Sequence, residues 1–287
     1  MGGGRDESRP YTGFRTGTVD HGPGNELTLR DEALGRVPRI VHGFTTRRGG
    51  VSTGPYESLN LSTATGDARK NVSENQRRVM TELGLGERVV VRAGQPHGSR
   101  VAIIDDRLQL GSREGTQVLD GVDALITDRE DVALLLTFAD CVPIFLAAAD
   151  GSCGGVAHAG WRGIVQNVAG TTVGALREAL GVEAHQVRVW IGPAVEGACY
   201  EVGEEVLRAL RRAAPGPQTF WSAGSPGKAF VDLRSAVWAQ LANAGVMPEA
   251  ISVDEHCTAC DDGLFFSHRR QGKPHGAMAA VIGLRGA

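Results

Sequence analysis

The sequence is poor in cysteine and in aromatic residues, and it contains no long apolar run. Five cysteines in 287 residues are too few for a scaffold built on disulfides, so we expect free thiols or metal ligands. No stretch approaches the roughly 18 consecutive apolar residues that a membrane helix needs. The N-terminus lacks the apolar core of a secretory signal. These absences predict a cytoplasmic protein without a membrane segment.

Excess basic charge is missing as well. The formal net charge is −3, whereas proteins that bind nucleic acid usually carry a basic excess or stripe. Hydrophobic residues make up 41% of the chain and charged residues 22%, as in ordinary globular proteins. The composition therefore predicts a globular protein that does not bind nucleic acid.

The domain organisation follows from length and local composition. Residues 1–25 are rich in glycine and polar residues, and we expect them to be disordered. A length of 287 residues suits one large domain or two small ones. The chain shows no internal repeat and no long linker, so residues 26–287 are expected to form a single domain.

Short apolar runs alternate with segments of helical periodicity. The runs at 122–127, 132–138, 142–148 and 154–160 are almost continuously apolar, as expected for strands covered on both faces. Helical spacing of apolar residues predicts helices at 71–84, 161–181, 201–213 and 232–245. This mixture predicts an α/β fold with α+β character, in which mixed β-sheet layers are flanked by helices within one domain.

Three residues that bind borderline and soft metals lie at loops or strand ends: His97, Cys141 and His158. Two imidazoles and one thiolate leave one position open on a tetrahedral zinc ion, which is typical of a catalytic site. Such an ion lowers the pKa of bound water or polarises a substrate oxygen. On spacing alone, the favoured interpretation is two hydrogen-bonded histidines and a buried thiol.

Two glycine-rich segments carry arginines that suit an anion. Arg162 lies in HAGWRG (158–163), where the chain turns into a predicted helix, and a guanidinium beside a helix N-terminus suits a phosphate. Arg47 and Arg48 belong to RRGG (47–50), a second loop of similar character. The alternative is an exposed helix residue and a solvated turn, and from the residues alone both interpretations stay open.

The remaining polar candidates are less specific. Asp140 precedes a cysteine and suits a general acid/base or a residue that orients a ligand, or else it ends a strand. Cys257 and Cys260 form a lone C-x-x-C, which we interpret as structural or incidental thiols. Cys153 and Cys199 are expected to be small buried apolar residues. The basic end of FFSHRR (265–270) faces a pocket or simply ends a strand.

Taken in order, the motifs are more specific than any one of them. They are HGFTTRRGGVSTGPYESLNL, GD at 66–67, NVSENQRR, GQPHG, VDALIT, ADCVPI, HAGWRG, IGPAVEGACYEV, VDL and CT followed by FFSHRR. Over about residues 40–284, the chain strongly resembles the YfiH-like laccase-domain family. That family was once labelled multicopper polyphenol oxidoreductases and is now regarded as purine nucleoside phosphorylases.

The resemblance implies a zinc-dependent enzyme. It implies that His97, Cys141 and His158 bind catalytic zinc, with copper less expected. It also implies phosphorolysis of adenosine, inosine, guanosine or methylthioadenosine, giving a free base and a (methylthio)ribose 1-phosphate. Adenosine deamination is a further activity of the family. The expected partners are purine nucleosides and phosphate, in a monomer or homodimer.

The side-chain roles are hypotheses that follow from this implied reaction. Cys141, Asp140 and Arg47 are the candidate catalytic residues. Arg47 and Arg162 would hold the anion, and Asn60 would hydrogen-bond to ribose or base. The chain departs from the family at Ala277, where an arginine is expected.

Three other functions remain. A copper oxidase of phenols would need further histidine clusters, and the chain has only 8 histidines. A cysteine hydrolase would use Cys141 with His158, in peptidoglycan-precursor editing, a role attributed to bacterial relatives. A non-enzymatic partner protein would keep the metal site for stability.

Overall fold

The computed structural model describes residues 15–16, 19–20, 27–110, 116–213 and 220–286. The disorder expected for residues 1–25 falls mostly outside these residues. Arg15–Thr16 and Val19–Asp20 are described and form the short strands β1 and β2. At these four residues the structure has regular elements where we expected none.

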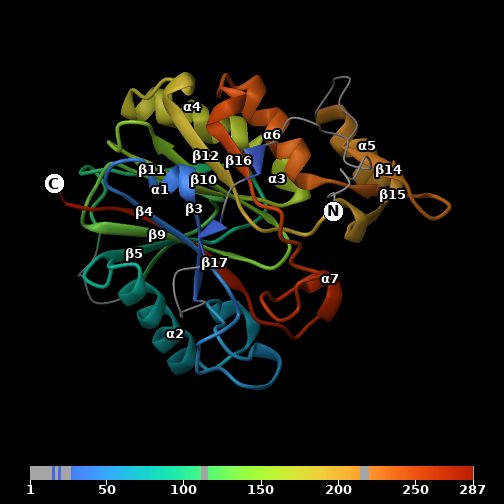
Figure 1. Cartoon of the computed structure of the whole chain (residues 1–287), viewed down its shortest axis with the longest axis horizontal. Coiled ribbons are helices and arrows are strands. Elements are labelled where there is room, and N and C mark those ends of the chain that lie inside the picture. Colours follow the sequence, from blue (N-terminus) through green and yellow to red (C-terminus); the bar gives the residue numbers. More distant parts are fainter. Residues whose placement is uncertain (1–14, 17–18, 21–26, 111–115, 214–219, 287) are drawn as a thin grey trace, which may run out of the picture.

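Two seven-stranded sheets form the centre of the molecule (Figure 1). In spatial order, the first sheet contains β1, β16 (Ile251–Val253), β12 (Val187–Ile191), β10 (Val142–Ala148), β11 (Gly154–Ala159), β8 (Ala124–Thr127) and β6 (Val101–Ile104). The second contains β2, β3 (Thr28–Asp31), β4 (Ile40–Thr45), β17 (Met278–Leu284), β9 (Val132–Phe138), β5 (Val89–Ala93) and β7 (Thr116–Leu119). Both sheets mix parallel and antiparallel pairs.

The two sheets pack face to face over one hydrophobic core. Residues of both sheets belong to this core, including Phe44 and Phe138 from the second sheet and Phe145 and Trp190 from the first. The rings of Phe145 and Trp190 stack with their centroids 4.8 Å apart. Strands that are apolar along their whole length suit sheets covered on both faces, and every residue of β10 and β11 is buried.

Helices cover the outer faces of the sheets. The helices are α1 (Glu32–Gly35), α2 (Arg69–Glu82), α3 (Trp161–Val165), α4 (Val168–Leu180), α5 (Glu204–Ala213), α6 (Leu233–Asn243) and α7 (His268–Gln271). Core residues of α4 and α6 pack on the first sheet, and those of α2 pack on the second. Figure 1 accordingly shows α2 on the side opposite α4 and α6. The α/β fold with mixed sheet layers flanked by helices is confirmed.

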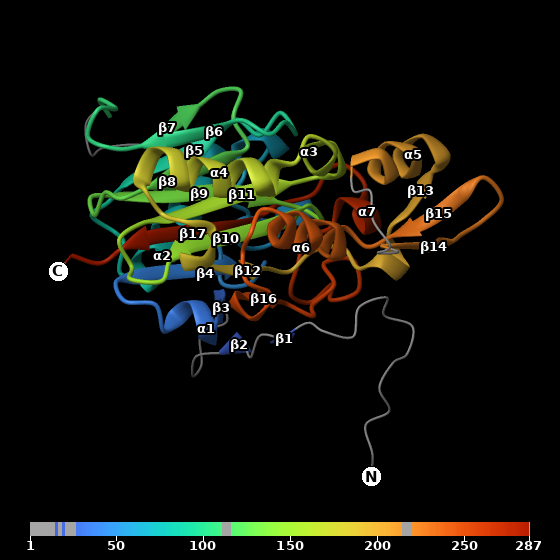
Figure 2. The ribbon, with the colours of Figure 1, turned by 90° about the horizontal axis from the view of Figure 1, so that it is seen from above.

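A third, small sheet lies at one end of the molecule. It contains β13 (Glu201–Gly203), β15 (Lys228–Val231) and β14 (Trp221–Ala223) in that order. Figure 2 shows it with α5 beside α3 and α7. The helix expected at 201–213 therefore begins later, because its first three residues form β13. None of the helices described is long and apolar enough to cross a membrane.

The helix expected at 161–181 is interrupted. It is divided into α3 and α4 around Asn167, whose φ of 60° is left-handed. The Asn167 side chain folds over Gly170, where an added Cβ would lie 2.5 Å from its amide nitrogen. Asparagine tolerates the left-handed conformation better than most residues, and Gly170 leaves room for its side chain. By contrast, α6 begins where expected, since Asp232 accepts a hydrogen bond from Ser235 N and caps it.

Candidate functional site

Three segments that are distant in the sequence bring His97, Cys141 and His158 together. His97 lies in the loop after β5, Cys141 lies in the turn before β10, and His158 lies in β11. Strands β10 and β11 pair antiparallel, with Pro143 opposite His158, so the start of β10 adjoins the end of β11. One ligand atom from each of the three residues lies within 4.8 Å of the others.

A buried carboxylate orients both histidines. Asp123 Oδ1 lies 2.9 Å from His158 Nδ1 and accepts a hydrogen bond of 3.0 Å from His97 N. Asp123 Oδ2 accepts a hydrogen bond of 2.6 Å from Gly98 N. With Nδ1 of His158 held by the carboxylate, Nε2 is the nitrogen left for a metal. This is the carboxylate–histidine arrangement typical of metal sites, and our interpretation of the sequence did not single out Asp123.

Electrostatics at the site favour a thiolate beside an imidazolium. Burial alone would raise the pKa of the Cys141 thiol, but the charge of His158 and hydrogen bonds from His158 and His97 lower it to about 6. Burial alone would lower the pKa of His158, but the Cys141 thiolate and the Asp123 carboxylate raise it to about 9. Both shifts favour the thiolate of Cys141, which is the form in which cysteine binds a metal.

Glycine at position 160 allows the backbone to pass close to His97 and Cys141. A Cβ added there would lie 2.8 Å from His97 Cδ2 and 3.1 Å from Cys141 Sγ. Real Cβ atoms essentially never approach other atoms within 3.0 Å. The HAGWRG segment thus supplies His158 and then passes close beside the other two candidate ligands.

Asp140 connects the site to two other segments. Its backbone is left-handed, with φ of 85°, and the residue is only 6% exposed. Its Oδ1 accepts a hydrogen bond of 2.7 Å from the Thr258 hydroxyl, and its Oδ2 accepts one of 2.6 Å from Arg269 N. Both oxygens therefore have partners within the protein, and a general acid/base role for Asp140 stays a prediction.

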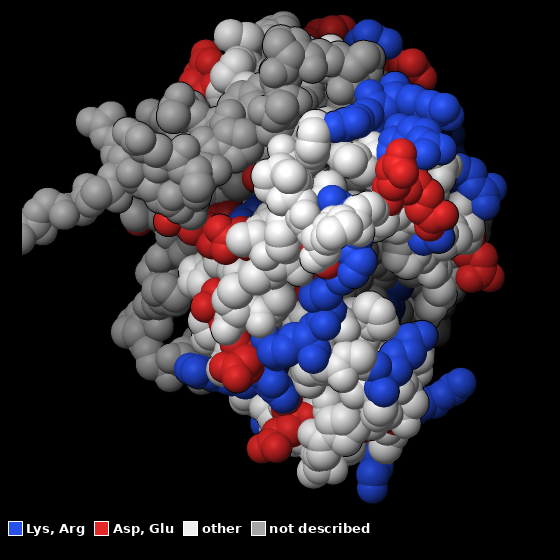
Figure 3. Space-filling view, turned by 90° about the vertical axis from the view of Figure 1, so that its right-hand side faces the viewer, with Lys and Arg blue, Asp and Glu red and all other residues white. Residues whose placement is uncertain are grey.

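A pocket of about 690 Å³ opens beside the candidate ligands. His97, Asp140 and Cys141 line it, together with the cations Arg162, Arg269 and Lys273, the histidines His268 and His275, and the aromatic residues Trp161 and Tyr200. The pocket thus combines candidate metal ligands, positive charge and aromatic rings. Figure 3 faces the end of the molecule that carries the small sheet, and Lys and Arg side chains lie across it.

Aromatic rings support two of the cations in the pocket. The Arg162 guanidinium lies 4.2 Å from the centre of the Trp161 ring. That of Arg269 lies 4.8 Å from the centre of the Tyr200 ring. Such contacts are attractive, and they hold the guanidinium groups at the pocket. The sequence indicated Arg162 as an anion ligand, whereas Tyr200 and Lys273 were not among the candidates.

The structure does not bring Arg47 to this pocket. Its guanidinium donates hydrogen bonds to the backbone oxygens of Glu57 and Asp262, and it lies 4.6 Å from the centre of the Phe266 ring. Arg48 is exposed and donates to the Gly263 oxygen. Arg47 as an anion ligand therefore stays a prediction for which the described contacts give no support.

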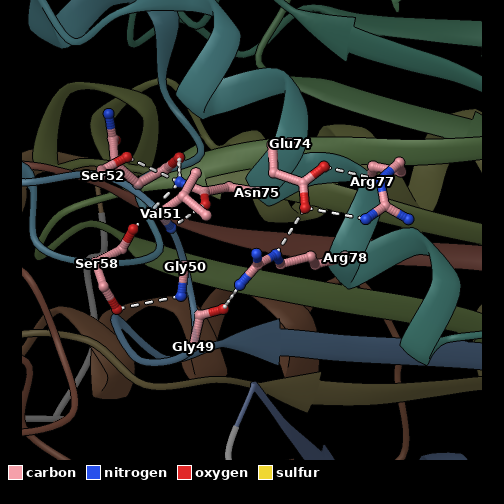
Figure 4. A network of polar contacts seen from close by, with 10 residues as sticks. Gly49, Gly50, Val51, Ser52, Ser58, Glu74, Asn75, Arg77 and Arg78 are labelled. Atoms are coloured by element: carbon pink, nitrogen blue, oxygen red, sulfur yellow. Dashed lines mark hydrogen bonds and ion pairs between the residues drawn. The ribbon is translucent and has the colours of Figure 1, made fainter.

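The glycine-rich loop that follows Arg48 is also held by the protein itself (Figure 4). Gly50 N donates to the Ser58 hydroxyl, and Val51 N donates to the side chain of Asn75 in α2. Arg78 of the same helix donates to the Gly49 oxygen. These contacts use the backbone donors that an anion would need, which favours the interpretation of this loop as a turn.

Asn60 lies in a buried polar network outside the pocket lining. Its amide donates to Ser62 O and to the side chains of Thr65 and Asp67. Its oxygen accepts from the backbone N–H of Ala277. These contacts support the loop and the start of β17, and a contact of Asn60 with substrate stays a prediction. Ala277 itself is buried and does not line the pocket.

Comparison with known proteins shows which family the chain resembles. The family model described as "Multi-copper polyphenol oxidoreductase laccase" matches residues 41–285. "Purine nucleoside phosphorylase YlmD" of Geobacillus stearothermophilus is 40% identical over 248 residues, which are 85% of this chain and 90% of that protein. "Adenosine deaminase RL5", from an unknown prokaryotic organism, is 35% identical over 242 residues, 81% of this chain and 89% of that one.

A solved structure agrees in fold. The Bacillus licheniformis protein YfiH superposes with a TM-score of 0.85 at 31% identity, covering 96% of this chain and 100% of that chain. The matched range of the family model contains His97, Cys141 and His158 and every residue named above as lining the pocket. The chain belongs to the YfiH-like laccase-domain family, whose model bears the name multi-copper polyphenol oxidoreductase laccase.

Proposed function

We propose that this chain is a zinc-dependent purine nucleoside phosphorylase. It would convert adenosine, inosine, guanosine or methylthioadenosine and phosphate into a free base and a (methylthio)ribose 1-phosphate. The observation that carries the proposal is a single pocket lined both by candidate metal ligands and by Arg162, Arg269 and Lys273. The relative named purine nucleoside phosphorylase YlmD, which matches 85% of this chain, supports it.

The donor set of the site fits zinc. Two imidazoles and a thiolate, with His97 and Cys141 facing an open pocket, are typical of catalytic zinc. When bound, zinc supplies Lewis acidity and lowers the pKa of a water ligand. A multicopper centre needs further clusters of histidine ligands. Among the described residues, the group of His97, Cys141 and His158 is the only cluster of three or more candidate metal ligands that contains histidine.

The cations of the pocket would bind phosphate. In phosphorolysis, a phosphate oxygen forms a bond to C1′ of the ribose while the bond from C1′ to the base breaks. The base leaves with the electron pair and takes up a proton. Arg162 and Arg269 present guanidinium groups, which bind phosphate through charge-assisted hydrogen bonds, and Lys273 adds a positive charge.

The histidine pair in the pocket suits the proton transfer. His268 Nδ1 lies 3.1 Å from His275 Nε2, and both residues line the pocket. Histidine is the side chain most often used as a general acid, so this pair would protonate the leaving base. Asp140 would position Thr258 and the start of α7 through its two hydrogen bonds.

A second activity has support from one comparison. The relative named adenosine deaminase RL5 is 35% identical to this chain, and a zinc site with an open position also suits attack by water on an adenine ring. Deamination would replace the exocyclic amino group with the oxygen of water, giving inosine and ammonia without using phosphate. The same pocket would then catalyse two reactions on one nucleoside.

The test is release of base from adenosine and inosine by zinc-loaded protein, with and without phosphate. Release that requires phosphate and disappears in Cys141→Ala is the expected result. Inosine formed from adenosine without phosphate would support the deaminase instead. Zinc-free protein that releases no base and whose Cys141 reacts with alkylating agents would support a cysteine hydrolase.

Phosphate recognition is tested separately. Arg162→Gln removes one charged donor, and charge-assisted hydrogen bonds contribute about 1.5–3 kcal/mol, so KM for phosphate should rise roughly 10- to 100-fold. Arg36→Gln, at an exposed residue directly after α1, is the matched control and should leave KM unchanged. Arg47→Ala tests the sequence-based assignment, and an unchanged KM would remove it.

A further inference from the structure

Three cysteines outside the pocket form a second thiol cluster. Cys199 ends the short 3-10 helix Gly197–Cys199, and Cys257 and Cys260 lie in the turn after β16. One sulfur from each residue lies within 4.8 Å of the others. The sulfurs of Cys199 and Cys260 are 3.2 Å apart. The lone C-x-x-C, interpreted from sequence as structural or incidental thiols, thus gains a third thiol from a segment about 60 residues away.

The backbone around the cluster is shaped to hold Cys257. Its backbone forms a parallel bridge with Ala194, and its N–H donates 3.1 Å to Asp261 Oδ2. The N–H of Glu196 donates 3.3 Å to the Cys257 sulfur. An N–H group that donates to sulfur stabilises negative charge there, as in the surroundings of metal-bound thiolates.

A tight turn brings the second sulfur of the motif to the same side. The N–H of Cys260 donates 3.1 Å to the Cys257 oxygen. Two cysteines separated by two residues on such a turn are typical of zinc ligands. Cys257 is buried and Cys260 is exposed, so the cluster reaches from the interior to solvent.

We propose that Cys199, Cys257 and Cys260 bind a second zinc ion through three thiolates, with solvent in the fourth position. The ion forms three metal–sulfur bonds and displaces the thiol protons to solvent. Zinc binds thiolate sulfur at about 2.3 Å, and three sulfurs already within 4.8 Å need only small side-chain movements to reach one centre. This site stands apart from the proposed catalytic function, because none of its three thiols lines the pocket.

The second zinc connects two walls of the pocket. Tyr200 follows Cys199 directly and lines the pocket. Thr258 follows Cys257 and donates a hydrogen bond to Asp140. An ion bound to both segments therefore fixes the loop that carries Tyr200 against the turn that holds Asp140. Its role is to stabilise the walls of the pocket, and it makes no contact with substrate.

The first test is the metal content of the full chain, purified under reducing conditions with zinc and then freed of loosely bound ions. Wild-type protein is expected to hold two zinc ions. Cys141→Ala is expected to keep one, and Cys199→Ser/Cys260→Ser is expected to keep one. Cys153→Ser, at a buried cysteine outside both groups, is the control and should keep two.

Cobalt identifies the ligands directly. In Cys141→Ala protein loaded with Co²⁺, sulfur-to-cobalt charge-transfer bands are expected, and adding Cys199→Ser/Cys260→Ser should abolish them. One zinc in wild-type protein, with none in Cys141→Ala, would overturn the proposal. A metal-free cluster with a Cys199–Cys260 disulfide, seen as a loss of 2 hydrogens by mass spectrometry, would also overturn it. The wild-type count does not depend on whether any variant folds.

Discussion

At the scale of single residues, Asp123 determines how the candidate metal ligands are arranged. One carboxylate holds the ring of His158, the backbone N–H of His97 and that of Gly98. It is fully buried, where an unpaired charge would be costly. These three partners make Asp123 a positioning residue for the candidate metal site.

Asp123→Asn tests this role. An amide keeps the size of the side chain but replaces one acceptor oxygen with a donor, so it cannot satisfy all three N–H groups. Loss of such a partner typically weakens metal binding 10- to 100-fold, and we expect that range from competition with a chromophoric zinc chelator. Asp128→Asn, at an exposed position, serves as control. Equal zinc affinity in all three proteins would contradict the role.

His42 links stability to pH. It lies in the core beside Trp190, and its Nε2 accepts a hydrogen bond of 3.0 Å from Asp31 N. Burial lowers its pKa from 6.5 to about 3. Below pH 6.5 the unfolded chain binds a proton there that the native state does not. The contribution of His42 to the free energy of unfolding is therefore fully present above pH 6.5. As the pH falls from 6.5 towards 3, this contribution decreases by up to ~1.4 kcal/mol per pH unit.

Urea unfolding between pH 7 and pH 4.5 tests whether protonation of His42 lowers the stability of the protein. His42→Gln keeps an acceptor for Asp31 N but cannot titrate, so its stability should fall less steeply with acid than that of wild type. His185→Gln, at an exposed histidine, should follow the wild-type curve. Parallel curves for His42→Gln and wild type would show that the buried histidine contributes no such dependence.

At the scale of elements, the junction of β11 and α3 is where the fold makes the site. His158 lies in β11, Gly160 caps the first turn of α3, and Arg162 follows within that turn. After the short α3, the left-handed residue Asn167 changes the direction of the chain, and α4 then packs on the first sheet. One strand end thus places a candidate metal ligand, His158, beside His97 and Cys141, and a cation, Arg162, in the pocket next to them.

Gly160→Ala tests the close approach at this junction. Its φ of −76° suits alanine, so the effect comes from the contacts of the new Cβ with His97 and Cys141. Zinc affinity is expected to fall at least about tenfold, which corresponds to ~1.4 kcal/mol. Gly174→Ala, in α4 with no atom within 4 Å of the new Cβ, should leave it unchanged. Unaltered zinc binding in Gly160→Ala would refute the steric argument.

Part of the fold and of the site could be predicted from sequence because it depends on residues that are neighbours in the chain. The apolar runs at 142–148 and 154–160 predicted strands that the structure confirms, since burial on both faces demands continuous apolar residues. Asp232 as a helix start was equally local. Asp123 could not be identified in this way, because a single carboxylate before an apolar run carries no sign of which N–H groups it will meet.

At the scale of the whole molecule, the site depends on how the two sheets and their loops meet. His97 follows a strand of the second sheet, and His158 lies in the first. Tyr200 and Lys273 come from still other segments, so only the three-dimensional arrangement assigns them to the pocket. The same reason explains why Cys199 and the C-x-x-C pair could not be connected from sequence.

The proposed phosphorolysis transfers a ribosyl group from a purine nucleoside to phosphate. The most direct measurement is ³¹P NMR of zinc-loaded protein with adenosine and inorganic phosphate, together with quantification of the free base. Phosphorolysis should give ribose 1-phosphate in equal amount to adenine, with neither product formed by Cys141→Ala. Adenosine that stays intact, or that becomes inosine while the phosphate signal stays unchanged, would contradict it.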